Sequence, residues 1–549
     1  MLDQFFEEEE EEASGSADGI AVGIDLGTTN TVVAHADHRG PVALLDEFGR
    51  MLQPSIVAFL PDGSMRVGQE ARGRRLMDPR NTIFSAKRII GQPFSSPRLQ
   101  KTIGNLPYEV VEGANQEPLI KTRAGEFSVP DIAAKVVAHA RDIASASAQR
   151  PVSHCVVTVP ANFNDAQREA TRRAVKSAGL EVLRILNEPT AAALAYGHGR
   201  NLNQQVVVFD MGGGTFDLSV LAVRRGLYEV LATGGDAFLG GDDMDHALAD
   251  ELARRFLKEH RLDPRTDPQS LTQLLISAEG VKMSLSRQDK AEVHIDELAH
   301  GVGGKALGLH TTITKAEFED LISPIVERAL ECAAAVLAEA DLLPQSVDEV
   351  LLVGGATHVP LVKKRVSELF GKAAQGDIDP MQVVALGAAA HAQALYAPGT
   401  IARVAASQDG SVAGASTEEG PIDLLLDVTS HPVGLATAGG YAEVLLDKNT
   451  PIPAEVTRTF STARDNQDWV TLKVCQGDDR QFEKNELLGE LKLEGIRPAP
   501  RGQVRIEVSF LINADGLLQV SARDTETGGE TSANLSLFGL SNEELEVVE

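Results

Sequence analysis

Two segments far apart in the chain share a residue pattern that suits phosphate binding. Residues 22–29 read VGIDLGTT and residues 207–215 read VVFDMGGGT, so each apolar run ends in an aspartate and a glycine- and threonine-rich turn. Glycines let backbone N–H groups approach phosphate oxygens, and an aspartate can face a hydrated metal ion. One such tripeptide usually marks only a strand-to-turn transition, but the pair predicts two half-domains that clamp a phosphate chain. The candidate residues are Asp25, Gly27, Thr28, Thr29, Asp210, Gly212, Gly213, Gly214 and Thr215.

Two commoner nucleotide-binding patterns do not fit this sequence. It lacks a G-x-x-x-x-G-K-[ST] loop, and no G-x-G-x-x-G follows the first apolar strand. Residues 301–305, GVGGK, look similar to a P-loop but open no helix and lack Ser or Thr after the lysine. We therefore expect a plain loop there, and neither a P-loop nor a dinucleotide-binding fold.

The elements that must position these residues alternate between strands and helices. From about residue 20 to residue 396 this alternation predicts α/β architecture. Residues 20–24, 155–159 and 206–209 are typical of buried strands, and residues 130–149 of an amphipathic helix. Asn164 and Gln167 form a capping-box pattern at a second helix, which Gly179 can close. The aspartate motif returns at a separation far beyond a solenoid period, so two similar halves are predicted.

The chain changes character twice beyond this region. Residues 397–420 are rich in Gly, Ser, Ala and Thr, which is typical of a mobile connection. Residues 423–428, DLLLDV, are interpreted as an apolar docking linker rather than a lone edge strand. From Thr429 the apolar period is two, and Asp515-Gly516 between alternating runs is a hairpin signal. A separate antiparallel β domain ending near Phe538 is therefore predicted.

Length and charge limit the remaining possibilities. The 549 residues favour two or more domains, and 43% hydrophobic with 24% charged residues is typical of a globular protein. The net charge of −28 disfavours nucleic acid and membranes as partners. The widely spaced Cys155, Cys332 and Cys475 predict three buried free thiols in a reducing compartment. The sequence shows neither a signal-peptide pattern at residues 1–13 nor an apolar run long enough to span a bilayer, so the cytoplasm is expected. Residues 7–12 are all glutamate, so residues 1–18 are treated as a disordered leader.

Several motifs, in consistent order, resemble the seventy-kilodalton heat-shock chaperones of the DnaK type. They are residues 25–30, 159–168 (VPANFNDAQR), 187–193 (NEPTAAA) and 210–217. The resemblance runs from about Gly19 to Leu540 and implies an actin-like, duplicated ribonuclease-H-like ATPase domain followed by an antiparallel β-sandwich. The implied divisions are an acidic leader (1–18), an ATPase domain (19–396), a flexible connection (397–422), a linker (423–428), a substrate-binding domain (429–540) and a short tail (541–549).

The resemblance also implies the chemistry of the site. Lys87 matches the lysine that orients the attacking water, and Glu188 the carboxylate that helps to place that water and the metal shell. Asp25, Asp210 and Glu188 would hold Mg²⁺ mostly through water, with ATP or ADP as nucleotide and K⁺ as a further candidate cofactor. Asp25, Asp210 and Thr215 join Lys87 and Glu188 as the implied catalytic set. Such a set suits phosphoryl transfer, which depends on positioning and charge neutralisation.

The implied nucleotide pocket departs from the family pattern at two places. Asp242 stands where a glutamate is expected, and His358 where an arginine usually lies against the base. Loss of that planar cation predicts weaker nucleotide binding. The remaining residues implied for the nucleotide are Gly241, Glu279, Lys282, Ser286, Gly354 and Gly355.

The resemblance extends to coupling and to peptide binding. Pro160, Arg168, Arg184, Asn187 and Asp427 match residues that relay between the two domains or face a co-chaperone. The implied substrates are unfolded or extended polypeptides, held by backbone hydrogen bonds with one apolar side chain near Val470. The implied channel consists of Val433, Leu435, Ala438, Phe460, Ala463, Val470 and Leu472.

The family also suggests partners and a missing segment. A J-domain co-chaperone, a nucleotide-exchange factor and a heat-stress role are expected from the resemblance. Family members normally continue into a helical lid, whereas this sequence stops soon after Leu545, so a lidless form is expected. Two alternatives stay open. The first is an actin-like small-molecule kinase, which would share the phosphate loops but would have no use for the β domain. The second is a non-hydrolysing partner of another chaperone, which would not need Lys87, Glu188 and Thr215.

Overall fold

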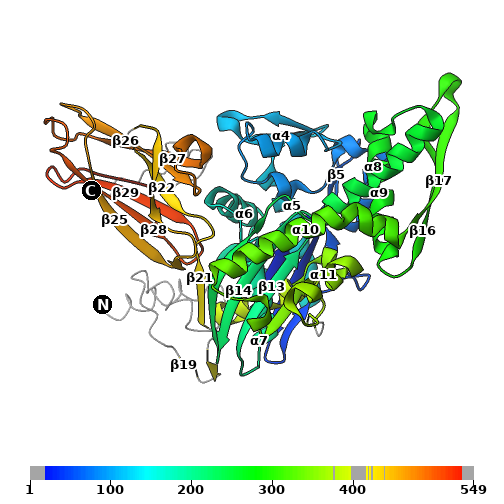
Figure 1. Ribbon diagram of the computed structural model, residues 1–549, viewed down its shortest axis with the longest axis horizontal. Coiled ribbons are helices and arrows are strands. Elements are labelled where there is room, and N and C mark those ends of the chain that lie inside the picture. The colour runs from blue at the N-terminus through cyan, green and yellow to red at the C-terminus, as the bar shows by residue number, and fades with distance from the viewer. Residues whose placement is uncertain are drawn as a thin grey trace, which may run out of the picture.

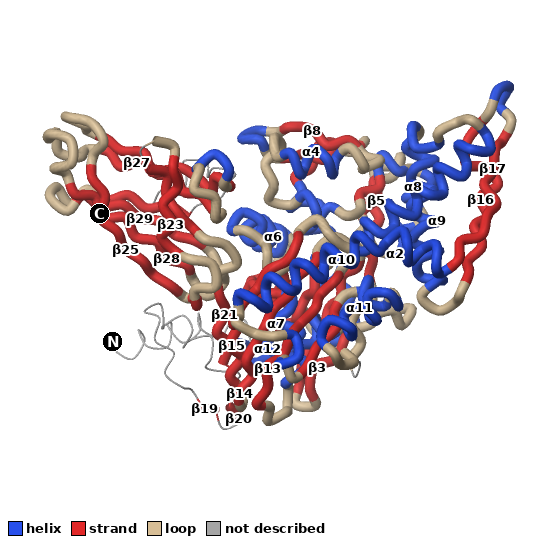
Figure 2. Tube along the Cα trace, in the orientation of Figure 1, coloured by secondary structure: helices blue, strands red, loops and turns tan. Residues whose placement is uncertain are grey.

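The computed structural model describes residues 19–374, 378–396, 416–417, 420–421, 424–437 and 439–534. The expected leader, most of the expected connection, Asp423, Ala438 and the expected tail lie outside the described residues. Two lobes of mixed helix and strand lie side by side, and a unit built mainly of strands lies at one end (Figures 1 and 2). None of the described helices is long and apolar enough to cross a membrane.

The first lobe is built on a sheet with strand order β12-β11-β1-β2-β3. β1 pairs with β2 as an antiparallel hairpin and with β11 in parallel, so the 22–29 motif lies at the end of a central strand. Three small strands, β5–β7, and the sheet β10-β9-β8 extend this lobe. The strands are β1 (Ile20–Leu26), β2 (Asn30–Asp37), β3 (Gly40–Ala43), β4 (Gln53–Pro54), β5 (Val57–Phe59), β6 (Met65–Val67), β7 (Thr82–Ile83), β8 (Glu109–Glu112), β9 (Pro118–Thr122), β10 (Gly125–Ser128), β11 (Val152–Val159) and β12 (Glu181–Asn187).

The second lobe repeats this arrangement. β13 pairs with β14 as an antiparallel hairpin and with β18 in parallel, which matches β1 with its neighbours β2 and β11. The two aspartate motifs therefore occupy equivalent places, in agreement with the predicted duplication. The strands are β13 (Asn203–Met211), β14 (Phe216–Arg224), β15 (Leu227–Asp236), β16 (Lys290–His300), β17 (Ala306–Thr314) and β18 (Glu349–Val353).

Helices cover both sheets and fill the space between them. The helices are α2 (Gln69–Arg72), α3 (Arg74–Met77), α4 (Pro97–Ile103), α5 (Val129–Ala148), α6 (Asp165–Ser177), α7 (Glu188–Gly197), α8 (Gly241–His260), α9 (Pro268–Leu285), α10 (Lys315–Glu339), α11 (Pro360–Phe370) and α12 (Val383–Tyr396). α7 and α12 belong to a core that also takes residues from both sheets. Their small residues permit this, since a Cβ on Gly387 would lie 1.7 Å from the carbonyl oxygen of Ala191.

Several local predictions are confirmed. α5 covers the predicted helix, shifted by one residue at each end. Asn164 and Gln167 form the capping box at the start of α6, and Gly179 follows its end with a φ of 79°. Residues 301–305 connect β16 to β17 and begin no α-helix. The cysteine prediction is wrong at Cys332, which is only half-buried because it lies at the edge of the second lobe's core.

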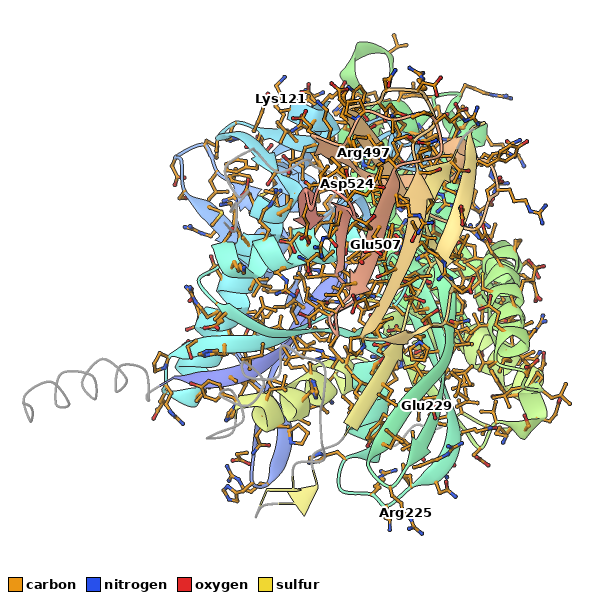
Figure 3. All side chains as sticks on the ribbon, turned by 90° about the vertical axis from the view of Figure 1, so that its left-hand side faces the viewer. Lys121, Arg225, Glu229, Arg497, Glu507 and Asp524 are labelled. Atoms are coloured by element: carbon orange, nitrogen blue, oxygen red, sulfur yellow. The ribbon has the colours of Figure 1, made fainter. Side chains whose placement is uncertain are left out.

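The β domain, residues 429–437 and 439–534 of the described chain, stacks two four-stranded antiparallel sheets with orders β23-β22-β26-β27 and β25-β28-β29-β30. The predicted hairpin at Asp515-Gly516 joins β28 to β29. Figure 3 views this domain from its outer side, with Glu507 and Asp524 on it and Glu229 of β15 below. The strands are β22 (Val433–Thr437), β23 (Tyr441–Leu446), β24 (Pro451–Ile452), β25 (Ala454–Ser461), β26 (Trp469–Gln476), β27 (Glu486–Glu494), β28 (Arg505–Ile512), β29 (Leu518–Asp524) and β30 (Glu530–Asn534).

The segment interpreted as a linker is a strand in the structure. β21 (Leu424–Val428) pairs in parallel with β15 of the second lobe and, through Asp427 and Val428, with β24. The apolar run thus completes the open edge of a sheet, which gives its backbone groups partners that an irregular linker would lack. Short strands β19 (Ser416–Thr417) and β20 (Gly420–Pro421) precede it.

Candidate functional site

A cleft of about 1300 Å³ opens between the two lobes, at the place where the two aspartate motifs meet. Both turns line it, and the β domain closes part of its rim with His431 and Glu486. The predicted residues in its wall are Asp25, Gly27, Thr28, Thr29, Lys87, Glu188, Asp210, Gly212, Gly213, Thr215, Gly241, Asp242, Glu279, Lys282, Ser286, Gly354, Gly355 and His358. The hairpins β1–β2 and β13–β14 place the two phosphate turns here because each motif forms the hairpin's turn.

The two turns approach each other too closely for side chains on their glycines. A Cβ on Gly213 would lie 2.0 Å from Thr29 Oγ1, and one on Gly214 would lie 2.9 Å from Thr28 Cγ2. Thr29 Oγ1 is buried and has no hydrogen-bond partner within the described chain. An unsatisfied buried hydroxyl beside exposed backbone turns is the arrangement that a phosphate oxygen would complete.

Acidic residues gather at the floor of the cleft around one lysine. Lys87 Nζ donates to Glu188 Oε1 at 2.6 Å, and both side chains are less than a tenth exposed. Burial, together with the nearby Glu188 carboxylate, raises the pKa of Asp25 to about 7. Burial and the charges of Glu188, Asp217 and Asp25 also raise the pKa of Asp210. Carboxylates held so close repel one another when they are ionised, and a divalent cation between them would relieve that repulsion. This floor therefore suits a divalent cation.

Asp217 lies close enough to this floor for its charge to raise the pKa of Asp210, and sequence reasoning did not select it. Its Oδ1 accepts from the backbone N–H and the Nδ2 of Asn162, at 3.0 and 2.9 Å. Its Oδ2 is buried without a hydrogen-bond partner in the described chain, and burial raises the pKa of this carboxyl to about 7. The one signal in the sequence was the place of Asp217 at the end of the 210–217 motif.

A second ionic cluster joins the lobes beside the phosphate turns. Arg88 Nη2 donates to Gly213 O at 3.1 Å and to Asp243 Oδ2 at 2.9 Å, and its Nε lies 3.3 Å from Asp242 Oδ2. Ser85 Oγ donates to the same Asp242 oxygen at 3.1 Å. Asp242, predicted to contact nucleotide, therefore already has two partners from the opposite lobe. Nothing in the spacing of residues 85, 88 and 243 indicated this bridge.

The residues predicted for adenosine lie on α9 and on the turn after β18. Lys282 Nζ donates to Asp245 Oδ2 at 2.6 Å and to Gly241 O at 3.0 Å. Glu279 Oε2 accepts from Arg75 at 3.3 Å. Gly354 has a φ of +82° and lies so near Met211 O that a Cβ would come within 2.4 Å of it. The structure therefore places this group on the second lobe's wall of the cleft.

Three of the predicted coupling residues form a hydrogen-bonded path between the first lobe and β21. Arg168 is buried and donates from Nη2 to Asn187 Oδ1 at 2.7 Å and from Nε to Phe163 O at 3.1 Å. Asn187 Nδ2 in turn donates to Asp427 Oδ2 at 2.8 Å. Burial raises the pKa of Asp427 and lowers that of Arg168. Pro160 is buried and directly follows β11.

The β domain is docked through an aspartate that sequence reasoning treated only as a turn residue. Asp515 pairs with Arg172 and with Arg184 Nε, the latter at 3.5 Å, and its Oδ1 accepts from the N–H of Ile185 at 3.2 Å. Asp165 Oδ1 accepts from the N–H of Leu518 at 2.8 Å nearby. Three partners converge on Asp515 from residues more than 300 positions earlier, which no local pattern could indicate.

Two further contacts hold the β domain on the lobes. Asn164 Nδ2 donates to Glu486 Oε1 at 2.5 Å, so the residue that caps α6 also holds β27. Lys448 Nζ lies 2.7 Å from Glu339 Oε2 at the end of α10. The described β domain is therefore tied to both lobes.

The residues predicted to bind peptide differ in burial. Val433, Leu435 and Val470 belong to the core between the two sheets, and Phe460 and Leu472 are half-buried against it. Ala463 is exposed beyond β25, and Ala438 lies outside the described residues. The structure therefore brings five of the seven together in one core, to which the exposed Ala463 does not belong.

A family model described as Hsp70 protein matches residues 21–548. The match includes both lobes, β21 and the β domain, which is nearly the whole chain. The chain belongs to the Hsp70 family, whose members are ATP-dependent chaperones that use a nucleotide with Mg²⁺.

Proposed function

We propose that this Hsp70-family chain hydrolyses ATP in the cleft between its lobes and couples that reaction to the binding and release of extended polypeptides by the β domain. The observation that carries this is the buried Lys87–Glu188 pair beside Asp25 and Asp210, at the meeting point of two glycine turns. It supplies a fixed positive charge and several carboxylates next to a phosphate cradle, as phosphoryl transfer to water requires.

The chain's own residues would divide the chemistry as follows. Backbone N–H groups of the turns containing Gly27 and Gly213 hold the phosphates, and Thr29 Oγ1 gains the partner it lacks. Lys87 orients the attacking water, with Glu188 fixing the position of its ammonium group. Mg²⁺, held through water by Asp25, Asp210 and Glu188, would neutralise the phosphate charge. The bridge from Arg88 to Asp242 and Asp243 keeps the lobes closed over the turns.

Coupling to the β domain would run through Arg168, Asn187 and Asp427. These residues make consecutive hydrogen bonds from the lobe that holds Glu188 to the strand β21, which leads into the β domain. Asn187 directly precedes Glu188, so movement at the cleft floor reaches this path within one residue. A nucleotide that favours the closed lobes therefore favours the docked β21 and β domain, and the converse holds by linkage.

The β domain would bind extended, apolar segments of unfolded proteins along its strands, near Val470 and Leu472. Strand-like backbone hydrogen bonding with one apolar pocket is a recurrent way to hold such peptides. A J-domain co-chaperone, a nucleotide-exchange factor and a cytoplasmic stress role belong to the same proposal and rest on family membership.

ATP turnover with and without an unfolded polypeptide tests this proposal. We expect phosphate release that rises when a reduced, unfolded protein is added, with no phosphorylated small molecule formed. A phosphorylated acceptor, or turnover indifferent to polypeptide, would favour the small-molecule kinase. ATP binding without any phosphate release would favour a non-hydrolysing partner of another chaperone.

A further inference from the structure

The hairpin β16–β17 carries a polar cluster that the nucleotide and peptide sites do not use. It forms an outer edge of the second lobe, beyond α8 and α9 and at the opposite end of the molecule from the β domain (Figure 1). On its inner face, Ala291, Val293 and Ile295 join the core of the lobe. Glu292, His294 and Asp296 alternate with them and are exposed on the outer face.

Register places two imidazoles directly opposite each other on that outer face. His294 pairs with His310 across the antiparallel strands, and their ring centroids are 4.0 Å apart with the planes at 86°. Directly opposed residues on one face of an antiparallel pair are close enough for their side chains to share a ligand. The pairing register of the two strands is therefore sufficient to bring two nitrogen donors together.

A β-bulge adds a carboxylate to the pair. The register shifts between Ile295 and Ala299, opposite Gly308, and a Cβ on Gly308 would come within 2.8 Å of the carbonyl oxygens of both Ile295 and Asp296. The missing side chain lets the strands stay close while the extra residues bend β16. Asp296 Oδ1 consequently lies 3.5 Å from His310 Nε2.

The three side chains offer one donor atom each, and these atoms all lie within 4.8 Å of one another. Zinc–donor distances of about 2.1 Å in a tetrahedron place two donors about 3.4 Å apart. The widest gap must therefore close by somewhat more than an ångström. His310 and Asp296 are 49% and 90% exposed, so rotation of their side chains meets little resistance.

The donor set selects the class of ion. Two neutral imidazoles and a carboxylate suit zinc and its transition-metal neighbours, whereas Mg²⁺ and Ca²⁺ prefer all-oxygen shells. The outer-face positions 292, 294, 296, 308, 310 and 312 carry two carboxylates and no lysine or arginine. Local charge therefore also favours a cation, with water completing the coordination.

We propose that His294, His310 and Asp296 form a surface zinc site that clamps β16 to β17. The clamp joins the strands at the bulge, where the ladder of backbone hydrogen bonds is interrupted. The hairpin packs against α8, where His260 Nε2 lies 2.9 Å from Gly308 O, and against α9. The bound ion therefore stiffens the outer wall of the lobe that holds the predicted adenosine residues.

Zinc titration of the nucleotide-free, Mg²⁺-free full chain, followed by hydrogen exchange, tests the proposal. We expect zinc to slow amide exchange in residues 290–314 of the wild type. His294→Gln and His310→Gln should each weaken that protection at least about tenfold in zinc concentration, because one of only three protein donors is lost. His300→Gln is the matched control, since His300 lies on the same hairpin but pairs with Glu297.

The local readout separates this site from any other that binds zinc. The proposal is overturned if zinc leaves exchange in residues 290–314 unchanged in the wild type. It is equally overturned if His294→Gln and His310→Gln respond to zinc as His300→Gln does. Asp296→Asn provides an independent check, because it should weaken the protection while leaving both imidazoles in place.

Discussion

Asp515→Asn tests whether the docked β domain depends on one turn residue. The side chain of Asp515 is 18% exposed and has partners at Arg172, Arg184 and the N–H of Ile185. The asparagine keeps the shape of the residue but loses the charge that both arginines face. Hydrogen bonds to charged groups contribute about 1.5–3 kcal/mol each, and the asparagine oxygen can still accept some of these hydrogen bonds. We therefore expect the free energy of docking to become less favourable by about 3 kcal/mol. This corresponds to a roughly 150-fold rise in the undocked population.

Hydrogen exchange of β21 measures that population. The β21 backbone is paired with β15 in the docked chain, so its protected amides exchange when the domain opens. Exchange in residues 424–428 should accelerate by up to the same factor, while the inner strands β28 and β29 keep their protection. Asp465→Asn is the matched control, because Asp465 is an exposed β-domain aspartate that accepts only from Arg501 N–H among the contacts described. Acceleration below about threefold, or equal to that of the control, would refute the assigned role of Asp515.

Three further results are expected. Lys87→Ala should retain ATP binding but slow single-turnover hydrolysis at least about a hundredfold, because a positioned charge is lost. The surface change Lys121→Ala is the control and should leave hydrolysis unchanged. Hydrolysis by Lys87→Ala within a few-fold of wild type would contradict this. The pKa of Asp217 is raised from 3.8 to about 7, so the folded state retains a proton that the unfolded state releases, and stability should fall as pH rises through that window. In metal-free urea unfolding, Asp217→Asn should therefore flatten the fall in stability between about pH 4 and pH 7, and an unchanged slope would count against the shift. Asp427→Asn should leave basal ATPase activity and peptide affinity nearly intact but remove the effect of each ligand on the other, and preserved mutual stimulation would exclude Asp427 from the coupling path.

The parts of the fold that could be predicted from the sequence depend on local signals. The phosphate turns, the capping box of α6 and the hairpin at Asp515-Gly516 each depend on a few consecutive residues, whose conformational preferences are expressed within the segment itself. The duplication could be predicted because the same strand-and-turn chemistry occurs twice.

Interactions between distant segments could not be predicted from such local signals. The apolar run at residues 424–428 was interpreted as a docking linker, but nothing nearby indicates that it docks as a strand along the open edge of β15. The bridge from Arg88 to Asp243 and the partners of Asp515 depend on how lobes and domain meet. The opposition of His294 and His310 depends on the register of two strands with a bulge between them, which a sequence pattern does not fix.

The central claim is that one chain couples nucleotide and peptide binding, and equilibrium linkage tests it most directly. The dissociation constant of an unfolded peptide is measured with ADP and with a non-hydrolysable ATP analogue, and that of the analogue with and without peptide, all on the full chain. We expect the analogue to weaken peptide binding at least about fivefold relative to ADP, and peptide to weaken analogue binding by that same factor relative to its effect on ADP binding, which is measured in the same way. Peptide affinity that is identical in the two nucleotide states would contradict the proposed function.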